Sequence, residues 1–212
     1  MFRKVWLMSI LAAFSFLNTT DAQEQRFKAG VILAGNLAQI DGDNSNGYIK
    51  LGISGGLRGV VILTDKIELS IELLFDQRGS RSQKIFDTNF FPFRITNNYV
   101  SVPVVFNYQD WLDKSEEYYK LHFHTGFSYG RLISSTIKDE DANSIFLTLR
   151  DHFRQDDVSL LIGATFYTGK HLAVTGRFVR SITPLYKNGD GPTNVRIPFI
   201  SKYLTFQLLY MF

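Results

Sequence analysis

Residues 48–79 read YIKLGISGGLRGVVILTDKIELSIELLFDQRG and decide the fold, because they describe two long alternating arms joined by a tight turn. On the second arm, apolar and polar residues alternate, with Ile67, Leu69, Ile71, Leu73 and Phe75 on one parity and Lys66, Glu68, Ser70, Glu72 and Asp76 on the other. Successive side chains of a strand point to opposite faces, so this period of two predicts a strand with one apolar and one charged face. The first arm repeats the pattern, which predicts a β-hairpin.

The same alternation recurs along the chain and predicts eight strands. They are the two arms of the hairpin and residues 27–37, 99–108, 119–133, 158–167, 172–179 and 204–212. Connections after the second, fourth and sixth strands are short, and those after the odd-numbered strands are mostly longer. An even strand number with this asymmetry is typical of outer-membrane barrels, whose strands need roughly 9–11 tilted residues to cross the bilayer. The predicted fold is an all-β, eight-stranded, antiparallel up-and-down transmembrane β-barrel with both termini in the periplasm.

Alternation alone does not say which face is inside, because a soluble lipocalin-type barrel would bury the apolar parity. The apolar face carries aromatic residues near the predicted strand ends, namely Phe27, Tyr108, Tyr119, Tyr210 and Phe212. Such positions match the aromatic girdles of membrane barrels. Glycines gather on the charged face, where they suit a crowded lumen. These features favour a membrane barrel over a soluble one.

Composition narrows the class further. Hydrophobic residues make up 45% of the 212 residues and the net charge is +3, so the bulk composition resembles that of a soluble protein. No apolar run long enough for a transmembrane helix follows the N-terminal segment, which excludes a helical membrane protein but not a barrel. The chain has no cysteine, so disulfides and zinc–thiolate sites are excluded. Basic residues are scattered rather than striped, which argues against nucleic-acid binding.

Residues 1–22 are predicted to be a signal peptide that is removed on export. Arg3 and Lys4 give a positive start, residues 5–17 are apolar, and Thr20-Asp21-Ala22 provides a small-residue cleavage site. The expected mature domain is therefore the barrel of residues 23–212.

The charged parity supplies candidate lumen residues: Arg58, Glu68, Glu72 and Arg177. Buried charges must be paired, so in a narrow lumen these four are expected to form an ion-pair network that plugs the barrel. The alternative interpretation is a gated or selective polar path. Eight strands leave an interior just wide enough for side chains, so a wide pore is not expected.

Several motifs admit a chemical interpretation beside a structural one. His122 and His124 form an H-x-H pair that could supply metal ligands, with His171 or Glu72 as further ligands across the lumen. The same histidines with Ser128 could indicate a hydrolase, although such a site is recognised by geometry rather than by sequence. Glycines 52, 55, 56 and 59 could resemble a phosphate loop but lie in a predicted strand without its lysine, so close strand packing is the better account. We therefore predict no catalytic residue, metal site or cofactor.

The predicted loop over residues 78–97 carries four phenylalanines, Phe86, Phe90, Phe91 and Phe93. Exposed aromatic residues at a loop tip can dock a partner or lipopolysaccharide. They can equally fold onto the rim of the barrel, and the sequence leaves both possibilities open.

The chain resembles the PorT-like outer membrane β-barrel proteins of Bacteroidota. The segments that carry the resemblance are residues 27–37, 52–80, 99–108, 124–132 and the closing YLTFQLLYMF, above all the run ELLFDQRG and the strand containing Pro103. The resemblance implies an outer-membrane location and recognition of the final aromatic, Phe212, by the barrel-assembly machinery. From the sequence as a whole we predict a non-enzymatic structural or interaction role that acts through the external loops, with accessory work in protein secretion or envelope assembly as one form of it. A small-solute channel with a polar lumen and a small membrane-embedded enzyme stay open as alternatives.

Overall fold

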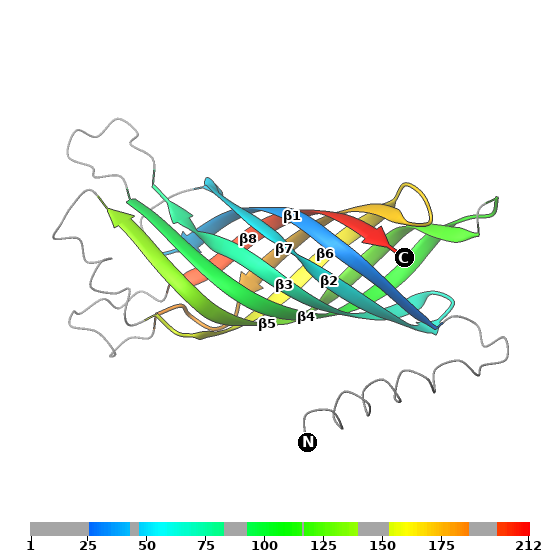
Figure 1. Cartoon of the computed structure of the whole chain (residues 1–212), viewed down its shortest axis with the longest axis horizontal. Helices are drawn as coiled ribbons and strands as arrows, with labels where there is room; N and C mark the ends of the chain where they lie inside the picture. The colour runs from blue at the N-terminus through cyan, green and yellow to red at the C-terminus, as the bar shows by residue number, and fades with distance from the viewer. Residues whose placement is uncertain (1–25, 43–46, 83–92, 116, 140–152, 187–198) are drawn as a thin grey trace, which may run out of the picture.

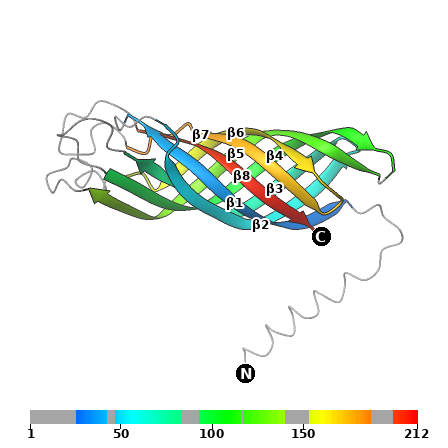
Figure 2. The same cartoon turned by 90° about the horizontal axis from the view of Figure 1, so that it is seen from above.

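The structure is a computed structural model, and it describes residues 26–42, 47–82, 93–115, 117–139, 153–186 and 199–212. Its eight strands close into one barrel in the order β1 to β8, each strand antiparallel to its neighbours (Figures 1 and 2). The strands are β1 (Phe27–Asp41), β2 (Lys50–Thr64), β3 (Ile67–Arg81), β4 (Phe93–Asp113), β5 (Tyr118–Asp139), β6 (Asp156–Tyr167), β7 (Leu172–Ser181) and β8 (Ile200–Met211). Within the described residues, no helix is long and apolar enough to cross a membrane. The predicted fold is confirmed; the predicted signal peptide lies outside the described residues.

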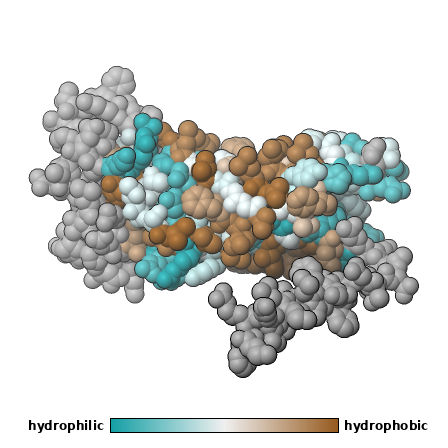
Figure 3. Space-filling model, in the orientation of Figure 1, coloured by the Kyte–Doolittle hydropathy of each residue, from teal (hydrophilic) through white to brown (hydrophobic). Residues whose placement is uncertain are grey.

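The apolar parity of the strands faces outward. In β2, Leu51, Ile53 and Leu57 are 71%, 64% and 60% exposed, whereas Ser54 and Arg58 on the other parity are each 2% exposed. Apolar side chains gather over the middle of the barrel and hydrophilic ones toward its two ends (Figure 3). A soluble barrel would reverse this arrangement, so an apolar belt around a polar interior defines the surface of a membrane-spanning barrel.

The two ends of the barrel differ. Short turns join β2 to β3, β4 to β5 and β6 to β7 at the end where Phe27 and Phe212 lie; we call it the short-turn end. The longer connections leave the opposite, long-loop end. Phe27, Tyr108 and Phe212 are exposed near the short-turn end, as an aromatic girdle requires. Tyr119 differs from the sequence expectation, because it is half-buried and lines a pocket in the barrel mouth.

The β4–β5 turn at this end is held by charge. Lys120 Nζ lies 2.7 Å from Asp113 Oδ2, and both the backbone and the hydroxyl of Ser115 donate to Asp113 Oδ1. Hydrogen bonds from Lys120 and Ser115 hold the pKa of Asp113 well below its usual range. The turn therefore keeps its carboxylate ionised.

The prediction of a loop over all of residues 78–97 is wrong, because strands occupy both ends of this segment at the long-loop end. β3 continues to Arg81 and β4 already begins at Phe93, while β5 extends past residue 133 to Asp139. Near the start of β4, Phe93 and Ile95 are buried and Arg94 is exposed, whereas beyond Tyr99 the exposed residues Val100, Val104 and Phe106 are apolar. The hydrophobic alternation inverts where the strand leaves the apolar belt, and that inversion hides the strand from a search for one continuous pattern.

Two local features of the backbone follow from the residue type at the position. The β3–β4 pairing steps from Ile71↔Val104 to Leu74↔Ser101 without Pro103, which cannot donate a ladder hydrogen bond. Gly56 lies in β2, and a Cβ there would clash with the carbonyl oxygen of Leu73 on β3. The glycine-rich stretch is thus a place of close strand approach.

Candidate functional site

The lumen holds a buried charge cluster built on Glu72 of β3. Arg177 of β7 reaches across the barrel and donates two hydrogen bonds to it, Nη1 to Oε2 at 2.8 Å and Nη2 to Oε1 at 2.9 Å. Arg58 of β2 places Nη1 3.5 Å from Oε1 of the same carboxylate. We call Arg58, Glu72 and Arg177 the central cluster. A bidentate arginine–carboxylate pair is among the strongest and most directional polar contacts in proteins.

Neutral side chains complete the central cluster. Arg58 Nη2 donates to Ser70 Oγ at 2.8 Å and to Asn107 Oδ1 at 3.0 Å. Arg177 Nε donates to His124 Nε2 at 3.3 Å, so this ring nitrogen accepts and His124 is neutral. Two arginines against one glutamate leave the cluster with a net charge of +1. The Arg177–Glu72 pair thus bridges the lumen between β7 and β3.

Close packing around the central cluster depends on Gly163 of β6. A Cβ at this position would lie 2.6 Å from His124 Nε2 and 2.9 Å from Arg177 Cα. We expect Gly163→Ala to lower the free energy of unfolding by about 1–3 kcal/mol, as overpacking does. Urea unfolding in lipid vesicles measures this change. Gly176→Ala is the matched control, because nothing lies within 4 Å of a Cβ added there, and an equal loss in both variants would contradict the packing argument.

A second buried cluster, which the sequence analysis missed, lies nearer the long-loop end. Arg78 Nη1 lies 2.7 Å from Asp157 Oδ2, and its Nη2 lies 3.9 Å from Asp76 Oδ2. The guanidinium lies over the rings of Tyr99 and Tyr203, with its carbon 4.4 Å and 4.8 Å from their centroids. We call Asp76, Arg78 and Asp157 the outer cluster, and its net charge is −1. Stacking on two aromatic rings suits arginine better than lysine.

An apolar layer covers the outer cluster. It consists of buried residues from several strands and connections: Ile40, Phe93, Ile95, Ile137, Phe153, Leu185, Tyr186 and Phe199. The Leu185 backbone amide donates to the carbonyl oxygen of Phe199 at 2.7 Å, which ties the connection after β7 to the start of β8. We call this layer the apolar cap. The lumen therefore holds two charge clusters, with an apolar layer on the side of the long-loop end.

The apolar cap decides between the two possibilities for Phe93, which folds onto the barrel. Phe93, a candidate for exposed partner docking, is 5% exposed and belongs to the cap. The alternation of apolar and polar residues is inverted in this part of β4, so an inward-facing residue is apolar. Phe86, Phe90 and Phe91 lie outside the described residues.

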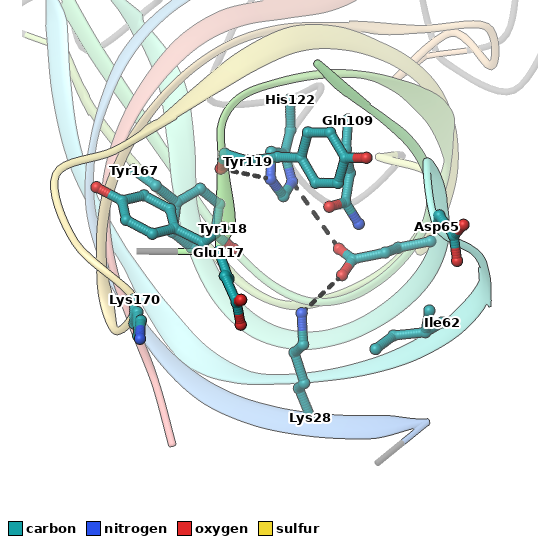
Figure 4. A pocket seen from close by; sticks show the side chains of 11 residues that line it. Lys28, Ile62, Asp65, Gln109, Glu117, Tyr118, Tyr119, His122, Tyr167 and Lys170 are labelled. Carbon is teal, nitrogen blue, oxygen red and sulfur yellow. Dashed lines mark hydrogen bonds and ion pairs between the residues drawn. The ribbon is translucent and has the colours of Figure 1, made fainter. Parts of the chain in front are cut away.

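The short-turn end opens into a pocket of about 320 Å³. Side chains from several strands and from the turns between them surround this pocket (Figure 4). Its lining residues are Lys28, Ile62, Asp65, Glu68, Gln109, Glu117, Tyr118, Tyr119, His122, Tyr167 and Lys170. Lys28 Nζ donates to Glu68 Oε1 at 3.0 Å, and His122 Nδ1 lies 3.9 Å from Glu68 Oε2. Of the four predicted lumen charges, three therefore meet in the central cluster and Glu68 belongs to the mouth pocket.

The two histidines of the H-x-H pair lie in different sites. His122 lies in the mouth pocket and its Nε2 donates to the carbonyl oxygen of Tyr119 at 3.2 Å, whereas His124 contacts Arg177 of the central cluster. His171 is exposed at the short-turn end, with Nδ1 2.8 Å from the Met211 carbonyl oxygen. Among the described residues, no group of three or more metal-ligating side chains could hold an ion. The Ser128 hydroxyl is buried without a hydrogen-bond partner there, so neither histidine is positioned to activate it.

An apolar exterior around a closed ring of eight antiparallel strands defines a transmembrane barrel of the outer-membrane type. Residues 21–187 match the family model of the outer membrane protein beta-barrel domain, and the chain belongs to that family. In such barrels the short turns face the periplasm and the longer loops the exterior. The short-turn end is therefore the periplasmic end, and the long-loop end is the external end.

Solved structures with a similar arrangement include outer-membrane proteins of several bacteria. Ail, the attachment invasion locus protein of Yersinia pestis, is 11% identical, with 87% of this chain and 98% of that chain covered at a TM-score of 0.45. Neisserial surface protein A is 11% identical, with 88% and 97% covered at a TM-score of 0.46. OprG from Pseudomonas aeruginosa is 11% identical, with 88% and 94% covered at a TM-score of 0.32. No curated protein matches the chain.

Proposed function

We propose that the protein is a non-conducting barrel that acts as a structural and interaction protein of the outer membrane through its external end. The observation that carries this proposal is the ion pair that crosses the lumen. Glu72 and Arg177 join opposite walls of the barrel, and the apolar cap lies above them. A solute would have to displace two buried charge clusters, each held by hydrogen bonds, before it reached the cap.

Bilayer recording tests this proposal against the alternative of a small-solute channel. We expect the purified protein to show no stable conductance steps in a planar bilayer that conducts normally when a known porin is added. A channel through the central cluster would instead give steps whose size changes in Glu72→Gln or Arg177→Gln. Stable steps of that kind in the wild-type protein would overturn the proposed function.

We propose no enzymatic activity and no cofactor. The support for this proposal is the separation of the histidines, with His122 in the mouth pocket and His124 occupied by Arg177. A hydrolase that used His122 would lose its activity on lipid or peptide in His122→Ala while keeping its fold.

We propose three kinds of partner for the barrel: lipopolysaccharide in the outer leaflet, the barrel-assembly machinery, and proteins of secretion or envelope assembly. Phe212 is the candidate assembly signal; its ring is 66% exposed and packs edge-on against Tyr210. We also propose that this chain belongs to the PorT-like branch of the Bacteroidota barrels. The run ELLFDQRG supports this assignment, and it supplies Glu72, Asp76 and Arg78 of the two charge clusters.

A further inference from the structure

Above the apolar belt, β3, β4 and β5 carry three successive rows of directly opposite residues on the outward parity, and all of them except Gly79 are polar. The first row is Gln77, Asn98 and Ser134, the second is Gly79, Thr96 and Thr136, and the third is Arg81, Arg94 and Lys138. The row below them, Phe75, Val100 and Arg131, marks the edge of the belt. We call the three upper rows the outer sheet face. No aspartate or glutamate occurs in it.

The third row places three cations side by side. Arg94 lies directly opposite Arg81 on one neighbouring strand and Lys138 on the other, and all three are exposed. Adjacent strands are about 4.8 Å apart, and like charges directly opposite each other destabilise a sheet. Among the residues that the structure describes, neither Arg94 nor Lys138 has an ion-pair partner. An anionic ligand would turn this repulsion into attraction.

The outer sheet face is held on a firm support. Directly behind it, Phe93, Ile95 and Ile137 are buried in the apolar cap. Its first row is a hydrogen-bonded ladder in which Gln77 Nε2 donates to Asn98 Oδ1 at 3.1 Å and Asn98 Nδ2 donates to Ser134 Oγ at 2.9 Å. The cations are therefore carried by a packed sheet, so their spacing is set before a ligand binds.

The height of the third row above the apolar belt indicates which part of the outer leaflet lies beside it. Arg94 lies six positions beyond Val100 on β4, which is roughly 20 Å along the strand and, with a strand tilt of about 40°, roughly 15 Å above the edge of the apolar belt. This level lies beyond the acyl chains, among the core sugars of lipopolysaccharide in the outer leaflet. Those sugars carry phosphate and carboxylate groups.

We propose that the outer sheet face binds the anionic core saccharide of lipopolysaccharide. Arg94 and Lys138 pair with its phosphate and carboxylate groups, because arginine forks and lysine ammonium groups are the usual partners of such anions. The amide and hydroxyl rows below them face the sugar hydroxyls, with which they share donors and acceptors. The proposal rests on the external interaction role proposed above and names one partner and its site.

Binding of lipopolysaccharide to the purified, detergent-solubilised barrel tests the proposal. The test variant is Arg94→Gln with Lys138→Gln, and the matched control is Arg154→Gln with Arg180→Gln, which removes two exposed cations outside the outer sheet face. We expect the test variant to bind at least tenfold more weakly and with a smaller salt dependence, because each surface cation attracts anionic lipid. We expect the control variant to bind as the wild type does. Retained heat-modifiable gel mobility verifies that both variants are folded.

Two further arms identify the ligand. Lipid A without core sugars should bind the wild type at least tenfold more weakly than lipopolysaccharide with its core. Inorganic phosphate at millimolar concentration should not displace bound lipopolysaccharide from the wild type. Equal binding by the test and control variants, equal binding of both lipids, or displacement by phosphate would each overturn the proposal. Arg94→Lys with Lys138→Arg keeps the charges and should keep the binding. None of these outcomes bears on conductance, so the proposed function is tested separately.

Discussion

Replacing Glu72 by glutamine is expected to lower the free energy of unfolding by about 3–5 kcal/mol, the usual cost of breaking a buried ion pair from one side. The substitution removes the one negative charge of the central cluster. It leaves Arg58 and Arg177 facing each other, with side chains 1% and 2% exposed. Desolvated cations without a counter-charge are costly because water cannot replace the lost carboxylate. Urea unfolding of the protein in lipid vesicles, followed by heat-modifiable gel mobility, measures the loss.

Charge arithmetic gives this prediction its control. The central cluster has a net charge of +1, which becomes +2 in Glu72→Gln and 0 in Arg58→Met. Arg58→Met keeps the bidentate Arg177–Glu72 pair and loses the hydrogen bonds to Ser70 and Asn107. We expect it to cost clearly less than Glu72→Gln. Equal losses in the two variants would show that packing, not charge, dominates the cluster.

An exposed ion pair supplies a second comparison. Arg131 Nη1 and Asp156 Oδ1 are 2.6 Å apart, closer than any contact within the central cluster, but each side chain is 50% exposed. Surface ion pairs contribute little because water competes for both charges. We expect Asp156→Asn to leave the unfolding transition unchanged, which would show that burial, not distance, sets the effect.

The sequence predicts most of the barrel because one physical rule applies along each membrane-crossing strand. A side chain that faces lipid is apolar and the next one faces the lumen. The polarity of Leu51, Ile53 and Arg58 therefore predicts which face of the strand each side chain occupies. The rule fails above the apolar belt, where water surrounds the barrel. There the outward residues Arg94 and Thr96 are polar and the inward residues Phe93 and Ile95 are apolar, so an upper strand resembles a loop.

Pairing within the lumen was predictable only where neighbouring strands meet. Arg58 and Glu72 share the charged parity of the hairpin, and a register shift between Ile62 and Thr64 places them directly opposite each other. Asp76 and Arg78 share the parity of Glu72, so the outer cluster had a signal that a longer count along β3 would have found. The bond from Arg177 to Glu72 crosses the lumen between β7 and β3. It depends on the stagger and tilt of the whole barrel, which no local pattern contains.

Replacing Arg78 by methionine is expected to be comparably damaging, with a loss of about 3–5 kcal/mol. The substitution leaves Asp76 and Asp157 buried at the same level of the lumen, and the net charge of the outer cluster falls from −1 to −2. Both carboxylates keep hydrogen bonds from serines, Ser54 to Asp76 at 2.5 Å and Ser159 to Asp157 at 2.7 Å. Neutral donors reduce the cost of burial but do not cancel charge. Arg180→Met, at an exposed cation, is the control and should leave the unfolding transition unchanged.

Arg78→Lys separates charge from shape in the same site. Lysine restores one positive charge near Asp157 but cannot lie flat between Tyr99 and Tyr203 or reach Ser101 and Asp157 with one planar group. We expect a stability between those of the wild type and Arg78→Met. Full recovery of stability in Arg78→Lys would show that stacking on the two tyrosines contributes little to the stability of the barrel. No recovery would show that the planar stack contributes more than the charge. In either case, Arg78→Met with Asp157→Asn should regain part of the loss, because it returns the cluster to a charge of −1.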